Sequence, residues 1–243
     1  DFQRVENSKN QRGGTYNYPS DMVFDNNKII EAMLRELHDP SLGHLGLFGC
    51  NGRLIKRSII IDNNIFFEEK LRWLEDKTFC WDVLGFVRNA RYLRKQLYSY
   101  YVYPKVSTGI TESLNRGFPI KWIKLITHHV KNSLKRRNLL HNEIEKLGQQ
   151  GLIFFSIQIL VSISRSIILG KIDYAKGKKT RKKIIKEIIN DNDVSMAIKN
   201  YSPSKKESLW IPRAIAWRSS IFLEFACNRR AKEVIQMRRS GKV

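Results

Sequence analysis

The sequence contains little cysteine, no CxxC pair and no secretory signal at its start. Its three cysteines, Cys50, Cys80 and Cys227, lie far apart along the chain. Such spacing is typical of buried thiols in a reducing compartment and argues against a disulfide framework or a zinc site. The chain begins at Asp1, without an initiator Met and without the apolar segment of a signal peptide. We therefore expect a cytoplasmic location.

The chain also lacks an unbroken apolar run of membrane-spanning length. Its longest apolar run, residues 152–169, is interrupted by polar side chains, namely Ser156, Gln158, Ser162, Ser164 and Arg165. A spanning helix needs about 20 predominantly apolar residues, and a central Arg costs about 2.5 kcal/mol or more on insertion. We expect this segment to be a helix buried in the protein rather than one inserted in a membrane.

Acidic residues are scarce relative to basic ones, and the imbalance is uneven along the chain. The sequence has 44 Lys and Arg against 23 Asp and Glu, which gives a net charge of +21. Residues 1–110 contribute +3 of this charge and residues 111–243 contribute +18. Such an excess attracts polyanions, whether nucleic acid, anionic lipid headgroups or diphosphate-linked substrates. The sign of the charge alone does not choose among them.

The pattern of apolar residues also changes near Ser107. Before it, helical spacing at 29–37 and 70–90 alternates with short β-branched and aromatic segments at 65–67 and 97–103, which favour strands. After it, apolar residues recur at helical spacing in four segments, at 120–134, 152–169, 184–189 and 215–225. We therefore predict an α/β part, residues 1–110, followed by a basic, mostly α-helical region, residues 111–243.

Four short segments between residues 27 and 108 occur in an order that resembles a known family. They are residues 49–58, 63–69, 73–76 and 97–108. They are similar to the stretches W-N-K-L-Y-R-R-S, N-N-I-R-F-D-E, G-E-D and L-Y-Y-Y-R-x-H-P-x-S-x-T of family 2 glycosyltransferases, which build capsules, lipopolysaccharides and related surface glycans. The resemblance implies that residues 1–110 are the acceptor-side half of an α/β domain of the GT-A fold. It also implies inverting transfer of a sugar from a nucleotide-sugar donor to a glycan or lipid-linked acceptor.

The resemblance assigns chemical roles to a few residues. Inverting transfer needs a base that takes the proton of the acceptor hydroxyl, and the family's Glu-Asp pair gives that role to Asp76, with Glu75 as its neighbour. Acidic side chains also favour the first turn of a helix, so a structural cap is the other interpretation of the pair. The family's Arg and His, which approach the donor diphosphate, are replaced by Val102 and Pro104. Lys105 is the candidate cation that takes their place.

The nucleotide-binding features of the family are missing from the start of the chain. No D-D-G-S or D-x-D stretch precedes residue 27. We expect the complete enzyme to use Mg²⁺ or Mn²⁺ held by residues outside this chain, and we expect the chain alone to be inactive or nearly so. Asp191-Asn192-Asp193 has the letters of the metal motif but follows an amphipathic helix rather than an apolar strand. We interpret it as a helix-ending loop.

The basic helical region has two functional interpretations. One is peripheral docking on the anionic inner face of a membrane, where each Lys or Arg contributes about 1 kcal/mol and Trp210, Trp217 and Phe222 serve as interfacial anchors. The other makes the chain a non-catalytic basic protein that binds nucleic acid through the same cations. No helix-turn-helix, zinc-finger or RNA-binding motif accompanies the charge. The glycosyltransferase resemblance favours the membrane.

Overall fold

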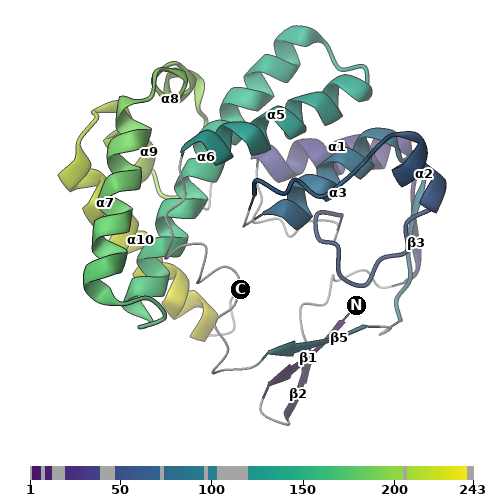
Figure 1. The fold of residues 1–243 in the computed structure, drawn as a ribbon, viewed down its shortest axis with the longest axis horizontal. Helices are drawn as coiled ribbons and strands as arrows, with labels where there is room; N and C mark the ends of the chain where they lie inside the picture. The colour runs from purple at the N-terminus through teal and green to yellow at the C-terminus, as the bar shows by residue number, and fades with distance from the viewer. Residues whose placement is uncertain are drawn as a thin grey trace. The chain divides into compact units, whose positions relative to one another are not determined.

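The structure, a computed structural model, divides the chain into two compact units. It describes residues 2–6, 9–12, 20–38, 47–71, 74–95, 98–102, 120–204 and 207–239. The first unit comprises residues 1–107 and 132–140, and the second comprises residues 108–131 and 141–243. Figure 1 shows the course of the chain through both.

The expectation of an α/β domain with a GT-A fold is wrong, because the described residues are mostly helical. The strands are short: β1 (Phe2–Glu6), β2 (Lys9–Arg12), β3 (Met22–Phe24), β4 (Ala90–Tyr92) and β5 (Tyr98–Val102). They form a three-stranded sheet in the order β2-β1-β5 and a separate antiparallel pair, β3-β4. Strand β5 lies within the segment predicted as a strand, but the described residues contain no extended sheet that helices could cover on both faces.

The strand expected at residues 65–67 is not formed, because a short apolar run does not distinguish a strand from other buried structure. The isoleucines at 59–61 lie in helix α2 (Arg57–Asp62). Asn63 then donates from its side-chain amide to the carbonyl of Ile59, at 2.9 Å, and Asn64 takes a left-handed φ of 51°. These two residues turn the chain out of the helix, so Ile65 is buried without joining a strand.

Helices α1 (Asn26–His38) and α3 (Glu75–Phe86) both contribute buried residues to the core of the first unit. The α1 residues predicted from helical spacing, Ile29, Met33 and Leu37, are all buried. Asp25 begins this helix by accepting a hydrogen bond from the Lys28 amide at 2.9 Å. Trp81 of α3 is fully buried in the same unit. The predicted stop at Asp39-Pro40 lies outside the described residues.

Two arginines at the end of helix α5 (Ile120–Arg136) hold the C-terminal end of α3 within the first unit. Arg137 is buried and donates to the carbonyls of Leu84 and Val87 and, at 2.6 Å, to the side chain of Asn26. Burial lowers the pKa of Arg137 to about 10. Arg136 pairs with Asp82 at 3.1 Å. A cation at the last carbonyls of a helix is favourable, so this contact stabilises the position of α3.

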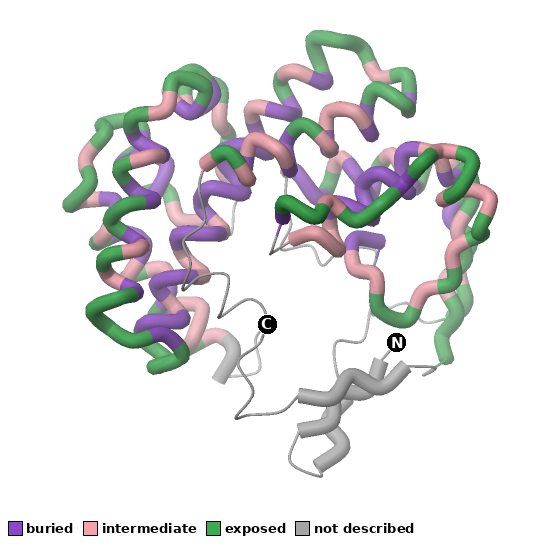
Figure 2. The backbone as a smooth tube through the Cα atoms, viewed as in Figure 1, coloured by how far each residue is buried: buried purple, intermediate pink, exposed green. Residues whose placement is uncertain are grey.

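The second unit is built around α6 (His141–Ile168), which packs against helices α7, α8 and α10. The other elements are α7 (Tyr174–Asn190), α8 (Asn192–Ala197), the 3-10 turn η2 (Ile198–Asn200), α9 (Trp210–Ala216) and α10 (Ser220–Arg239). By length and composition α6 could cross a membrane, but 67% of its most apolar window is buried within the chain. Its tube is largely in the buried colour in Figure 2. The structure thus shows the buried helix expected at residues 152–169.

A buried arginine joins three helices of this unit. Arg181 of α7 is 4% exposed and donates to Ser164 of α6 at 3.1 Å. It also donates to Asn228 and pairs with Glu224, both on α10 and both at 2.5 Å. The lysine-rich start of α7 otherwise faces water. Within residues 176–183, all of which the structure describes, Arg181 is the only buried Lys or Arg.

Candidate functional site

Asp76 and Glu75, the residues assigned to catalysis by the resemblance, lie in the first turn of α3. Leu74 precedes them in a left-handed conformation, with a φ of 62°. The Thr78 hydroxyl and amide both donate to the Leu74 carbonyl, at 2.7 and 2.8 Å, and fix this turn. Asp76 accepts a hydrogen bond from the Lys77 amide at 2.7 Å. Both acidic side chains are half-buried. Because they lie in the first turn of the helix, the helix dipole favours their negative charge.

The segment 49–58, similar to the first stretch of the family, contacts the start of α3. The Cys50 thiol donates to the backbone carbonyl of Asp76 at 3.4 Å. Arg53 of the same segment donates from Nε to the carbonyl of Gly49 and so closes the loop on itself. Cys50 and Asp76 are 26 residues apart in sequence, so this contact brings segment 49–58 against the start of α3.

The segment 63–69 lies against α3 as well. Phe67 stacks on Phe79 of α3, with ring centroids 4.3 Å apart and the planes 5° from parallel. Phe67 nevertheless remains 49% exposed, and its neighbour Phe66 is 68% exposed. Three of the four segments that resemble the family therefore meet at one helix. Of the fourth, only the backbone of β5 is described, and Lys105 lies outside the described residues, as does Trp73.

A buried ion pair anchors this helix start to α1. The ammonium of Lys77 contacts Oε1 of Glu36, with side-chain exposures of 12% and 1%. Removing either partner would leave the other charge buried without a partner, which is strongly destabilising. The pair therefore restricts the motion of α3 relative to α1, and with it the position of Asp76.

Two cysteines that are distant in sequence lie together beside Asp76. The sulfur atoms of Cys50 and Cys80 are 3.6 Å apart, and Cys80 is buried whereas Cys50 is half-buried. A hydrogen bond from Cys80 lowers the pKa of the Cys50 thiol. The same hydrogen bond, together with burial, raises the pKa of Cys80. Sequence spacing gave no indication of this pair, because only the return of segment 49–58 to α3 creates it.

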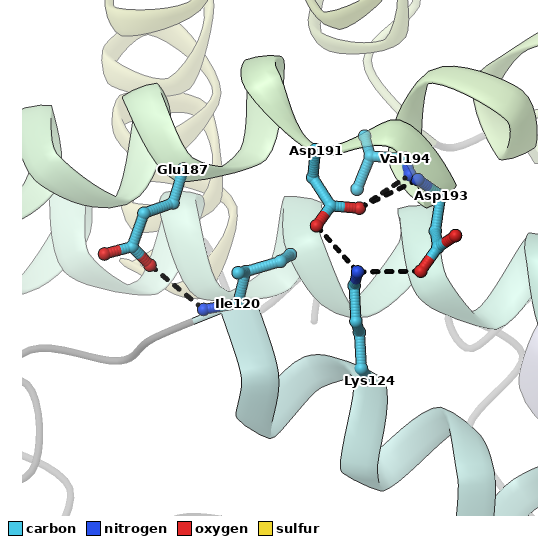
Figure 3. A network of polar contacts seen from close by, with 6 residues as sticks. All are labelled: Ile120, Lys124, Glu187, Asp191, Asp193 and Val194. Atoms are coloured by element: carbon cyan, nitrogen blue, oxygen red, sulfur yellow. Dashed lines mark hydrogen bonds and ion pairs between the residues drawn. The ribbon is translucent and has the colours of Figure 1, made fainter.

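The D-x-D letters at residues 191–193 do not form a metal site in this structure. Lys124 of α5 places its ammonium 2.7 Å from a carboxylate oxygen of Asp191 and 2.7 Å from one of Asp193 (Figure 3). The other oxygen of Asp191 accepts from the amides of Asp193 and Val194, at 3.0 and 3.1 Å, and caps α8. The lysine fills the position between the carboxylates that a cation would need. The expected helix-ending loop is not formed as such: Asp191 is the C-cap of α7, and Asn192 and Asp193 are already the first residues of α8.

The environment of Lys124 reinforces this structural role. Burial lowers its pKa, but hydrogen bonds to Asp191 and Asp193 outweigh burial and raise the pKa above its ordinary value. Glu187 of α7 accepts the backbone amide of Ile120 at 3.1 Å, at the start of α5 (Figure 3). Within the part of the chain that the structure describes, no group of three or more His, Cys, Asp or Glu side chains is placed to hold a metal ion.

A small open groove lies in the second unit between α8, η2 and the end of α9. Its volume is about 130 Å³, and its apolar lining includes Val194, Ile198 and Ile215. Two cations, Lys199 and Arg218, also line it. The groove is too small for a nucleotide-sugar, so it is not a candidate donor site.

Comparisons with known proteins add no assignment. No protein-family model, no curated protein and no solved structure matches the chain. The residues at the start of α3 and their surroundings are the features that bear on function. The roles given to Asp76, Glu75 and Lys105 stay predictions.

Proposed function

We propose that the chain serves the acceptor side of an inverting sugar transfer, with Asp76 as the base on the acceptor hydroxyl. The observation that carries the proposal is the meeting of three family-like segments at the start of α3. Cys50 contacts the backbone of Asp76 at 3.4 Å, and Phe67 stacks on Phe79 at 4.3 Å. The proposal concerns the chemistry of this helix start and does not depend on the GT-A architecture.

The reaction would use the half-buried carboxylate of Asp76 as follows. The acceptor hydroxyl transfers its proton to Asp76 while its oxygen bonds to the anomeric carbon of the donor sugar. The bond between that carbon and the diphosphate oxygen breaks, and the nucleoside diphosphate leaves with the bonding electrons. A bound Mg²⁺ or Mn²⁺ would offset the charge on the leaving diphosphate. The described residues contain no group of three or more His, Cys, Asp or Glu side chains that could hold the ion, and Lys124 pairs with both aspartates of the D-x-D stretch.

The remaining residues of the site would position the base. The hydrogen bond from the Lys77 amide holds Oδ1 of Asp76, and in the proposed reaction Oδ2 takes the proton of the hydroxyl. The Thr78 bonds to Leu74 fix the turn, and the Lys77–Glu36 pair fixes the helix. Glu75 would act as a neighbour that adds negative charge near the base. Lys105 would approach the donor diphosphate, as the resemblance implies.

The proposal is tested by replacing the gene in the cells that carry it. Asp76→Asn keeps an oxygen for the Lys77 amide but removes the basic carboxylate, so we expect the surface glycan that depends on this gene to be lost. Asp62→Asn is a matched control, because Asp62 is an exposed carboxylate at the end of α2. Glycan composition is measured by mass spectrometry of the isolated polymer. An unchanged glycan in Asp76→Asn cells, or in cells without the gene, would overturn the proposal.

A further inference from the structure

The corner between α9 and α10 presents apolar side chains to solvent instead of covering them. Large exposed fractions are found at five residues: Leu209 (55%), Trp210 (43%), Trp217 (64%), Ile221 (83%) and Phe225 (61%). Isolated exposed apolar residues are ordinary, but a contiguous group of them marks an interaction site. We call this group the α9–α10 face.

Ring contacts join the two tryptophans of the face. The ring of Phe222 lies 5.8 Å from that of Trp210 and 5.5 Å from that of Trp217, so one phenylalanine bridges the two tryptophans. Ile221 and Phe225 are four residues apart on α10 and therefore lie on the same side of that helix. The opposite side of α10 is occupied by core residues such as Leu223 and Cys227, both 0% exposed. Helix α10 is thus apolar on two sides where it begins.

The charges along the face are mostly positive. Between residues 209 and 225 the chain has two arginines, Arg213 and Arg218, and one acidic residue, Glu224. The guanidinium of Arg213 lies 5.6 Å from the centre of the Trp210 ring. Arg218 lines the small groove together with Lys199. That one acidic residue, Glu224, pairs with the buried Arg181 at 2.5 Å.

We propose that the α9–α10 face docks on the surface of a membrane that contains anionic phospholipid. Trp, Phe and Leu side chains beside Arg and Lys are the combination that lies at the boundary between headgroups and acyl chains. Ile221 and Leu209 gain by entering the acyl region and gain little from a phosphate backbone, so a bilayer fits the face better than nucleic acid. The arginine rim opposes docking of a second copy, because like charges would meet. The proposal does not depend on the role of Asp76.

The test uses the full chain and sedimentation with phospholipid vesicles. The wild type is expected to bind vesicles made of equal parts phosphatidylcholine and phosphatidylglycerol, and to bind phosphatidylcholine alone weakly. Trp217→Ala and Ile221→Ser should each weaken binding about tenfold, because each removes a large apolar side chain that would be buried in the bilayer on docking. Arg213→Gln and Arg218→Gln should each weaken it about fivefold. A shift of tryptophan emission to shorter wavelength on binding should disappear largely in Trp217→Ala.

Matched controls separate the face from general charge and hydrophobicity. Leu54→Ser removes an exposed apolar residue from the first unit, where Leu54 is 102% exposed, and should bind as the wild type does. Lys182→Gln removes one exposed charge from α7 and should reduce binding less than Arg213→Gln. Leu54→Ser and Lys182→Gln change exposed residues, so their melting temperatures should match the wild type, and melting temperatures of Trp217→Ala and Arg218→Gln show whether the contacts with Phe222 and Ser195 also affect stability.

Three results would overturn the proposal. The first is no binding of the wild type to the mixed vesicles. The second is equal binding by the wild type and by Trp217→Ala and Ile221→Ser. The third is tighter binding of duplex DNA than of vesicles, at the same salt concentration, with the DNA affinity lost in the same variants.

Discussion

Replacement of Arg181 by Met should destabilise the protein strongly, although it substitutes an apolar side chain at a buried position. The substitution removes the hydrogen bonds to Ser164 and Asn228 and the ion pair with Glu224. Breaking a buried ion pair costs about 3–5 kcal/mol. Glu224 is 21% exposed and is therefore partly hydrated once its partner is gone, so we expect a loss of about 3 kcal/mol.

A second variant tests the cause of that loss. In the double variant Arg181→Met, Glu224→Leu no charge is left without its partner, so we expect it to be more stable than Arg181→Met alone. The pair is also imperfect, because the buried Nε of Arg181 has no hydrogen-bond partner in the structure. That unsatisfied donor costs about 1–3 kcal/mol in the wild type and is absent from both variants.

The free energy of unfolding is measured by urea denaturation followed by circular dichroism. Lys182→Met is the control, because Lys182 is the exposed neighbour of Arg181 on α7 and should change stability by less than about 0.5 kcal/mol. If Arg181→Met is as stable as this control, Arg181 is not buried between α6, α7 and α10. The packing described for the second unit would then be wrong.

Two further predictions concern the cysteines. A mild thiol oxidant should join Cys50 to Cys80 in a disulfide, with loss of two hydrogens, because their sulfur atoms are 3.6 Å apart. Cys227 should stay reduced, because it is 0% exposed. Peptide mass mapping that finds Cys227 in the disulfide would contradict this arrangement. Burial raises the pKa of Cys227 to about 12 from 9.0. The folded state therefore keeps a proton that the unfolded state loses above pH 9.0, and stability should fall as pH rises from 9.0 towards 12. Urea titrations at pH 8 and pH 10 should show a smaller fall for Cys227→Ala, and an equal fall would refute the assignment.

The helices were predictable from the sequence to the extent that their apolar residues repeat regularly. The spacing of Ile29, Met33 and Leu37 identified α1, and all three are buried. The apolar run at 152–169 identified the buried part of α6, whose interruptions by Ser156 and Ser164 proved to be fully buried positions rather than breaks. The hydroxyl of Ser156 donates a hydrogen bond to the carbonyl of Leu152 at 2.7 Å, which is why a buried serine is tolerated at this position.

The α/β architecture was not predictable from the short segments that suggested it. A run of three apolar residues suits a helix or a strand, and the choice depends on whether a neighbouring strand offers hydrogen bonds. Asn63 and Asn64 turn the chain after α2, so Ile65 is buried by packing alone. The order of the short segments therefore did not predict the fold of this part of the chain.

The polar contacts of the site depend on parts of the chain that are far apart in sequence. Cys50 and Cys80 are 30 residues apart, and Lys124 reaches Asp191 from another helix. Neither contact has a signature in local spacing, because each arises from the packing of whole helices. The sequence placed the D-x-D letters at 191–193 after a helix, but it did not show that Asn192 and Asp193 begin α8 or that Lys124 pairs with both aspartates.

Sugar transfer by membranes from the cells that naturally carry the gene, which supply the donor- and metal-binding residues expected outside this chain, tests the role of Asp76 most directly. Membranes with the wild type and with Asp76→Asn are given radiolabelled nucleotide-sugars and Mn²⁺, and the label that enters glycan or lipid-linked product is counted. Loss of a general base lowers the rate about 100-fold or more, and that is the loss expected for Asp76→Asn. Asp62→Asn membranes should transfer sugar at the wild-type rate. Equal transfer by wild-type and Asp76→Asn membranes would contradict the account.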